Sequence, residues 1–133
     1  MENAKFDSVN VLVIEDNELA SRVVVHILEK LGVDQVMTAD NGANALEILK
    51  ESNADIDICI CDLEMPVMGG YEFIRRVRYG TVPKYKDVPI LVLTGADTEK
   101  NVKKSRIYRI SGFMIKPPTI EDLGQQISQT LGL

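Results

Sequence analysis

Short apolar runs alternate along the chain with segments of helical spacing. The runs are rich in Val and Ile, which is typical of strands buried on both faces. They predict five strands, over Val9–Ile14, Gln35–Thr38, Ile56–Cys61, Pro89–Leu93 and Gly112–Ile115. Strands that alternate with helices favour right-handed crossovers and a parallel sheet covered by helices on both faces. The ligand site of such a sheet lies beyond the carboxyl ends of its strands.

The segments between these runs have the spacing of amphipathic helices. Four of them carry a clear apolar face, formed by Leu19, Val23, Ile27 and Leu31 in the first, by Ala45, Leu46 and Leu49 in the second, by Phe73, Ile74 and Val77 in the third, and by Ile120, Leu123, Ile127 and Leu131 in the last. A further helix is expected near 98–108, where only Val102 and Ile107 clearly point inward.

Capping and turn residues mark the ends of several elements. Gly32 stands where a helix C-cap is expected, and Asn41-Gly42 marks a turn after the second strand. Thr119 with Asp122 makes an acidic capping box for the last helix. The stretch 79–88 has no clear period, so we expect a long surface loop there.

Composition narrows the classes of function. The 133 residues are 45% hydrophobic and 26% charged, which is typical of one globular domain, expected to span residues 1–133. Fifteen basic against twenty acidic residues leave a net charge of −5, which disfavours non-specific nucleic-acid binding. Two cysteines cannot form a disulfide framework, and neither a signal peptide nor a transmembrane segment is expected. We therefore expect a cytoplasmic protein with no direct nucleic-acid partner and no membrane partner.

Polar side chains gather where the predicted strands end. They are Glu15 and Asp16 after the first strand, Asp62 and Glu64 after the third, Thr94 after the fourth and Lys116 after the fifth. Taken singly, each has an ordinary explanation, such as helix capping or a solvated surface position. Together they place several acids at one sheet edge, where the carboxylates repel one another unless a cation joins them. Oxygen ligands with no His or Cys nearby suit Mg²⁺ best.

The residues at this edge carry a family resemblance. The sequence D-L-E-M-P-V-M-G-G over 62–70 resembles the pattern D-x-x-M-P-x-M-x-G of response-regulator receiver domains, the CheY-like family of two-component signalling. The acid pair, the 22-residue spacing from Thr94 to Lys116 and the K-P dipeptide are also similar, and the resemblance runs from about Val9 to Leu131. It implies a doubly wound α/β (βα)5 fold, a flavodoxin-like three-layer sandwich with a parallel five-stranded sheet of order 2-1-3-4-5.

What the resemblance implies for function is a phosphorylation switch. Asp62 is then the phosphoacceptor, and a sensor histidine kinase or a phosphotransfer protein supplies the phosphoryl group. Lys116 holds the phosphoryl oxygens, and Thr94 hydrogen-bonds the phosphoryl group. Such a chain is not an enzyme in the usual sense, since it catalyses only its own phosphotransfer and dephosphorylation.

The same resemblance implies a metal set and a responsive surface. Mg²⁺ is held by the side chains of Asp16 and Asp62, by the backbone carbonyl of Glu64 and, through water, by Glu15. Phe113 occupies the family's aromatic switch position, although it lacks a hydroxyl. Switching changes the surface of the fourth helix, fifth strand and fifth helix, through which receivers also form homodimers. The downstream effector is not indicated.

The sequence departs from the family pattern in a few places. Glu64 and Ala96 occupy positions linked to phosphoryl lifetime, and Arg109-Ile110 replaces a commonly small Gly-Ala pair. Pro118 follows Pro117, which can shift the start of the last helix. The helix before the last strand is basic, through Lys100, Lys103, Lys104, Arg106 and Arg109, which is either a solvated face or a docking surface for an acidic partner.

Two other functions compete with the switch. One is a phosphorylation-independent interaction domain on the same scaffold, which Mg²⁺ binding would discriminate. The other is an Mg²⁺-dependent aspartyl phosphatase, for which the chain is short of a cap and a substrate pocket. Cys59 and Cys61 are expected in the core, and His26 on the surface of the first helix.

Overall fold

A computed structural model describes residues 4–51, 53, 55–95 and 106–133. Its strands are β1 (Asn10–Ile14), β2 (Gln35–Ala39), β3 (Ile58–Asp62), β4 (Ile90–Thr94) and β5 (Gly112–Ile115). Its helices are α1 (Glu18–Leu31), α2 (Gly42–Glu51), α3 (Gly70–Tyr79) and α5 (Ile120–Leu131), with 3-10 turns η1 (Ala4–Phe6) and η2 (Pro83–Tyr85). The helix expected near 98–108 falls mostly outside the described residues, as do Ala96, Lys100, Lys103 and Lys104.

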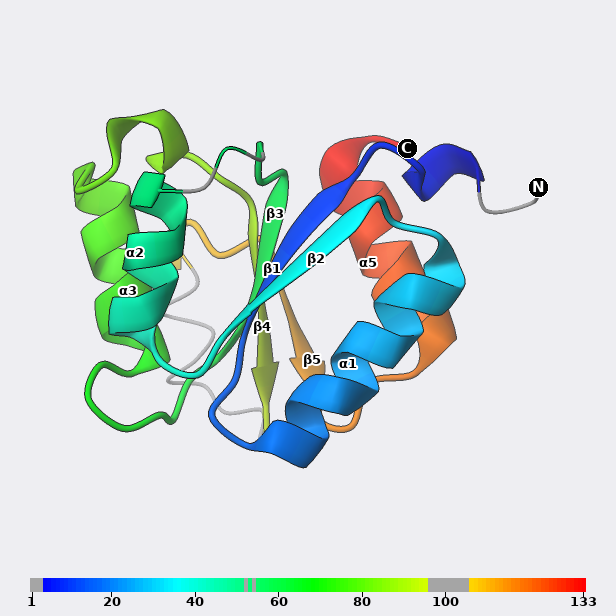
Figure 1. Cartoon of the computed structure of the whole chain (residues 1–133), viewed down its shortest axis with the longest axis horizontal. Helices are drawn as coiled ribbons and strands as arrows, with labels where there is room; N and C mark the ends of the chain where they lie inside the picture. Colours follow the sequence, from blue (N-terminus) through cyan, green and yellow to red (C-terminus); the bar gives the residue numbers. More distant parts are fainter. Residues whose placement is uncertain (1–3, 52, 54, 96–105) are drawn as a thin grey trace.

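The five strands form one parallel sheet in the order β2-β1-β3-β4-β5. Helices α2 and α3 cover one face, and α1 and α5 cover the other (Figure 1). The expected doubly wound three-layer sandwich is therefore confirmed. Strand β5 has the predicted bounds, the other four strands differ from the prediction by one or two residues at one or both ends, and Asp62 is the last residue of β3.

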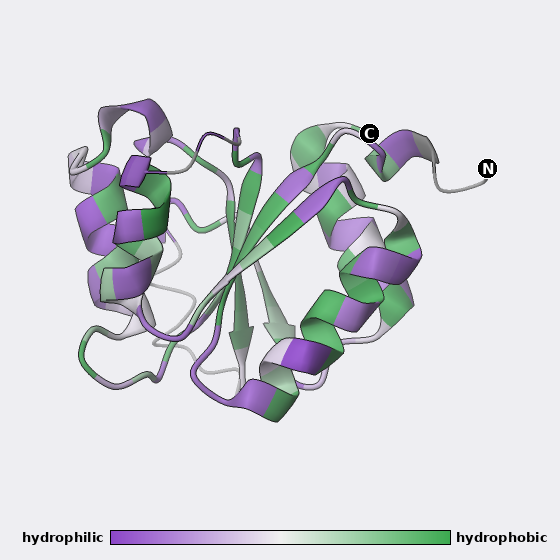
Figure 2. Ribbon diagram, in the orientation of Figure 1, coloured by the Kyte–Doolittle hydropathy of each residue, from purple (hydrophilic) through white to green (hydrophobic). Residues whose placement is uncertain are grey.

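Two apolar clusters lie on opposite faces of the sheet. Side chains of successive strand residues point to opposite faces, so Cys59 and Cys61 join the cluster beneath α2 and α3 while Ile58 and Ile60 join the one beneath α1 and α5. In Figure 2 hydrophobic residues follow the strands, and hydrophilic residues lie on the outer sides of the helices. Both cysteines are fully buried, as expected, and burial raises the pKa of the Cys59 thiol to about 12.

The buried face of α1 is only partly as predicted. Leu19 is 71% exposed and Val23 is 39% exposed, whereas Val24 and Leu28 are buried together with the expected Ile27 and Leu31. The first turn of α1 extends past the carboxyl edge of the sheet, where no strand lies beneath it (Figure 1). The inward stripe thus keeps two of the predicted residues and adds Val24 and Leu28.

The predicted caps are confirmed, but the expected surface loop is not wholly exposed. Gly32 ends α1 with a φ of 87°, and the Thr119 side chain accepts a hydrogen bond from the Asp122 amide at 3.1 Å. Within the 79–88 loop, Tyr85 is buried and its hydroxyl accepts a hydrogen bond from the Ile56 amide at 3.2 Å. None of the helices in the described ranges is long and apolar enough to cross a bilayer.

Candidate functional site

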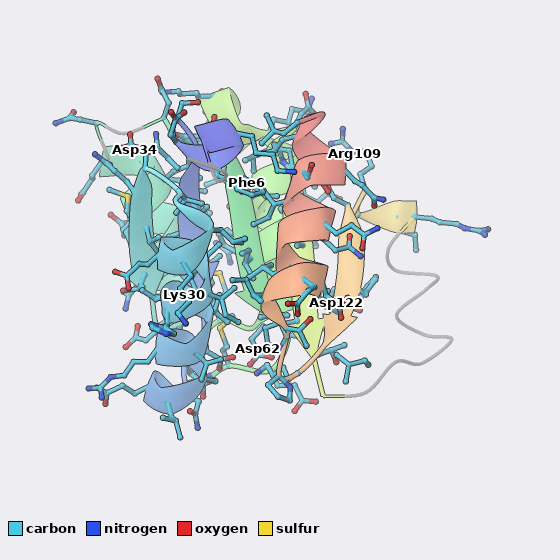
Figure 3. All side chains as sticks on the ribbon, turned by 90° about the vertical axis from the view of Figure 1, so that its right-hand side faces the viewer. Phe6, Lys30, Asp34, Asp62, Arg109 and Asp122 are labelled. Atoms are coloured by element: carbon cyan, nitrogen blue, oxygen red, sulfur yellow. The ribbon has the colours of Figure 1, made fainter. Side chains whose placement is uncertain are left out.

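The sheet itself fixes the backbone at the site. Just past β1, the Glu15 amide donates to the Ala39 carbonyl of β2 at 3.0 Å. Just past β5, the Lys116 amide donates to the Thr94 carbonyl of β4 at 2.9 Å. Asp62 ends β3 between them, at the edge of the sheet opposite Phe6 (Figure 3). The structure thus brings the predicted strand-end residues to one edge.

Three carboxylates converge at this edge. One oxygen each of Glu15, Asp16 and Asp62 lies within 4.8 Å of the others, and Glu15 and Asp62 are buried while Asp16 is exposed. The helix cap does not account for Asp16, because Asn17 is the residue whose side chain accepts from the Ala20 amide. A set of carboxylate oxygens open to solvent on one side is the donor set that a hard divalent cation prefers. The triad therefore fits a site for a divalent cation such as Mg²⁺.

Lys116 lies between two of these acids. Its Nζ is 2.6 Å from Glu15 Oε1 and 3.1 Å from Asp62 Oδ1. Burial opposes the charge on the amine, but the hydrogen bonds to both carboxylates outweigh it and raise the pKa of Lys116 above its usual value. The amine thus stays protonated and offsets part of the negative charge at the edge.

Both carboxylate oxygens of Glu15 accept a hydrogen bond. Oε1 accepts from Lys116, and Oε2 accepts from the Asn17 amide at 3.1 Å. Burial raises the pKa of Glu15 and the nearby Asp62 charge adds to the rise, although the bonds from Lys116 and Asn17 oppose it. Glu15 therefore orients the Lys116 amine and joins it to the start of α1.

The loop after β3 depends on the last glycine of the D-x-x-M-P-x-M-x-G motif. A Cβ on Gly70 would lie 2.2 Å from the Asp62 carbonyl oxygen, so no larger residue fits without moving the backbone. The Gly70 amide donates to the Leu63 carbonyl at 2.9 Å, and the Gly42 amide of α2 donates to the Met68 carbonyl at 2.9 Å. The close approach of α3 to β3 thus fixes the peptide of Asp62.

The remaining predicted site residues lie nearby or on the adjoining strands. Thr94 is buried at the end of β4, and Glu64 is exposed in the loop after β3. Phe113 is half-buried in β5 and packs against the cluster beneath α2 and α3. His26 is exposed on α1, as expected.

Sequence reasoning missed the direct contact between Glu15 and Lys116. Strands β1 and β5 are separated by β3 and β4, and neighbouring strands lie about 4.8 Å apart. The Glu15 and Lys116 side chains are long enough to meet across the two intervening strands, where Lys116 also contacts Asp62. No spacing in the sequence indicates this contact, because it depends on the rotamers of both side chains.

The comparisons with known proteins agree with this geometry. The family model for the response regulator receiver domain matches residues 11–128. The chain is 31% identical over 121 residues to a chemotaxis protein CheY homolog of Campylobacter jejuni, with 91% of each chain covered, and 29% identical to chemotaxis protein CheY1 of Helicobacter pylori, with 91% and 95% covered.

Solved structures and a larger protein are similar as well. Chemotaxis protein CheY4 of Vibrio cholerae superposes with a TM-score of 0.83 at 31% identity, covering 93% of this chain and 99% of that one. The CAI-1 autoinducer sensor kinase/phosphatase CqsS of Vibrio cholerae is 31% identical over 107 residues, which are 80% of this chain and 15% of that protein.

Proposed function

The chain belongs to the response regulator receiver domain family, and we propose that it is a phosphorylation-dependent signalling switch with Asp62 as its phosphoacceptor. Receiver domains act in two-component signalling with histidine kinases. The proposed donor is the phosphohistidine of a sensor kinase or of a phosphotransfer protein. The proposed catalysis is limited to the chain's own phosphotransfer and dephosphorylation.

One observation carries the proposal: the Asp62 carboxylate ends β3 with Lys116 Nζ at 3.1 Å on one side and two further carboxylates within 4.8 Å. A carboxylate can act as a covalent nucleophile. In the proposed step an Asp62 oxygen forms a bond to phosphorus, the P–N bond to the donor imidazole breaks, and its electron pair stays on the nitrogen. Lys116 then offsets charge on the phosphoryl oxygens.

Mg²⁺ is the proposed cofactor, and the residues that would hold it are the side chains of Asp16 and Asp62 and the backbone carbonyl of Glu64. Glu15 would contribute through a bound water. When bound, the ion supplies positive charge that neutralises the phosphoryl oxygens and the clustered acids. The site offers only oxygen donors from these residues, which agrees with a hard cation.

The proposed output begins at Thr94 and Phe113. Phosphorylation adds close to two negative charges at the sheet edge, and the Thr94 hydroxyl hydrogen-bonds the phosphoryl group. Phe113 then repacks, which changes the surface around β5 and α5 that a downstream effector or a second copy of the chain would contact. Phe113 is only half-buried, so part of its side chain lies at the surface that the proposal involves.

Beryllofluoride, a mimic of the acyl phosphate, tests the proposal without a cognate kinase. Isothermal titration with beryllofluoride in the presence of Mg²⁺ is expected to show one site in the wild type and none in Asp62→Ala. Asp40→Asn, which changes an exposed acid outside the carboxylate triad, is the matched control and should bind as the wild type does. Absence of both Mg²⁺ and beryllofluoride binding in the wild type would instead favour a phosphorylation-independent interaction domain.

A further inference from the structure

A single arginine of α3 joins two loops at the far end of the sheet from Asp62. Arg78 Nε donates to the Tyr108 carbonyl at 2.9 Å, Nη2 donates to the Arg109 carbonyl at 3.1 Å, and Nη1 donates to the Lys86 carbonyl at 3.0 Å. All three guanidinium nitrogens are thus used on backbone oxygens. The planar fork of arginine makes such a contact possible, and lysine cannot reproduce it.

The residues it holds form a tight turn, which we call the 106–110 turn. Arg106 and Ile107 are helical and the chain leaves the helix at once, with Arg109 at a φ of 54°. The last carbonyls of a helix lack partners within the helix, so Arg78 supplies donors that the turn cannot supply itself. A non-glycine residue is strained at this φ, and the contacts of the turn offset that strain.

Two further contacts fix the same turn. The Arg109 guanidinium pairs with Asp87 at 2.6 Å, and the rings of Tyr71 on α3 and Tyr108 lie 6.0 Å apart. In Figure 3 Arg109 is remote from Asp62, towards the opposite end of the sheet. The 106–110 turn is therefore tied to α3 and to the loop before β4, and not to the acidic site.

The turn leads directly into the strand that carries the proposed switch residue. The Ser111 amide donates to the Ile90 carbonyl at 2.8 Å, and β5 begins at the next residue. Tyr108, Ile110 and Phe113 all pack against the cluster beneath α2 and α3. If Phe113 repacks, the 106–110 turn must move with it or resist the movement, and Arg78 holds that turn in place.

We propose that Arg78 is a positioning residue that restrains the 106–110 turn in the arrangement where Lys116 contacts the free Asp62 carboxylate. The inference rests on the proposed phosphorylation switch and adds a regulatory restraint to it. The inference is that the three hydrogen bonds are made only in that arrangement, so that they raise the cost of leaving it and weaken the response to a phosphoryl group. Loss of the three hydrogen bonds should therefore bias the chain towards the responding arrangement.

The experiment compares beryllofluoride affinity, in the presence of Mg²⁺, among the wild type, Arg78→Met and Arg78→Lys. Arg78→Met is expected to bind at least about fivefold more tightly, and Arg78→Lys less so, because one ammonium can contact only part of the three carbonyls. Arg76→Met is the matched control, because Arg76 lies on the same helix and its guanidinium pairs with Glu72 at 2.7 Å rather than with a carbonyl of the turn. Amide exchange of Ser111 should also accelerate in Arg78→Met and not in the control.

Each outcome decides the inference. Unchanged or weaker beryllofluoride binding in both Arg78 variants, with normal binding by the wild type, would overturn the restraint and leave the switch intact. No binding by the wild type would overturn the proposed function and the restraint with it. If Arg78→Met does not fold, Arg78→Lys and Asp87→Asn, which removes the partner of Arg109, must both bind more tightly for the inference to stand.

Discussion

Replacing Lys116 tests how strongly the acidic edge depends on its amine. Lys116→Met keeps the length of the side chain and removes the charge between Glu15 and Asp62. Both acids are almost inaccessible, with 4% and 10% of their side chains exposed, so solvent cannot replace the lost cation. We expect the variant to be less stable than the wild type in buffer without divalent ions.

The size of the loss follows from the geometry. At distances of 2.6 and 3.1 Å, each contact is worth roughly 5–6 kcal/mol of Coulomb energy at an effective dielectric constant of about 20. Desolvation offsets much of this, and breaking a buried pair costs about 3–5 kcal/mol in other proteins. Because 27% of the Lys116 side chain is exposed, solvent screening reduces the expected loss to about 2–4 kcal/mol.

Urea unfolding followed by circular dichroism measures this loss, since the chain has no tryptophan to report by fluorescence. Lys84→Met is the control, because its pair with Asp55 is exposed and such pairs add little stability. Mg²⁺ should restore a large part of the stability of Lys116→Met. A deficit no larger than that of the control, or one that Mg²⁺ leaves unchanged, would refute the reasoning.

The pH dependence of the deficit gives a second check. Burial raises the pKa of Glu15, and the bond from Lys116 opposes that rise. Without Lys116 the folded state takes up a proton at Glu15 more readily, and an acid whose folded pKa lies above its unfolded value gains stability as the pH falls. The deficit of Lys116→Met should therefore shrink as the pH falls towards 4.5, the ordinary pKa of a glutamate.

Three further predictions concern residues around the site and on α3. Gly70→Ala should lose about 2–4 kcal/mol in urea unfolding, because its Cβ meets the Asp62 carbonyl oxygen at 2.2 Å. Gly95→Ala should change little, since no atom of the described residues lies within 4 Å of its Cβ, and equal losses would count against the close approach. Hydrogen bonds from Arg75 and Arg76 lower the pKa of Glu72 to about 2. The wild type should therefore be more stable than Glu72→Gln above about pH 4.5, and this difference should vanish as the pH falls through about 2. A difference in stability that does not depend on pH would contradict this. Glu64→Asn should alter the half-life of the phosphorylated chain through water access, measured by intact mass after removal of the phosphodonor, and an unchanged half-life would exclude that role.

The sequence predicted the edge of the sheet that carries the site because strand order and chain direction decide it. Parallel strands bring their carboxyl ends together, so Asp62, Thr94 and Lys116 meet wherever the five strands pair in register. The prediction needed no detail of packing. The motif glycine is explained by the structure alone, through the close approach of Gly70 to Asp62.

The errors came from features that only tertiary packing decides. The spacing of Leu19 and Val23 is helical, but periodicity does not show which turns of a helix extend past the edge of the sheet and stay exposed. Tyr85 lies in the segment predicted as a surface loop, yet it is buried in the cluster beneath α2 and α3 and its hydroxyl accepts a hydrogen bond from the Ile56 amide. Nothing in the sequence indicates the contacts of Arg78, because its three acceptors are backbone oxygens, which every residue carries.

The central claim is that Asp62 accepts a phosphoryl group, and intact mass spectrometry after incubation with acetyl phosphate tests it most directly. The wild type should gain the mass of one phosphoryl group with Mg²⁺ and none without it, and Asp62→Ala should gain none in either buffer. Addition of the group to Asp62→Ala, or addition to the wild type that does not need Mg²⁺, would contradict the account. So would a wild type that neither gains mass nor binds beryllofluoride.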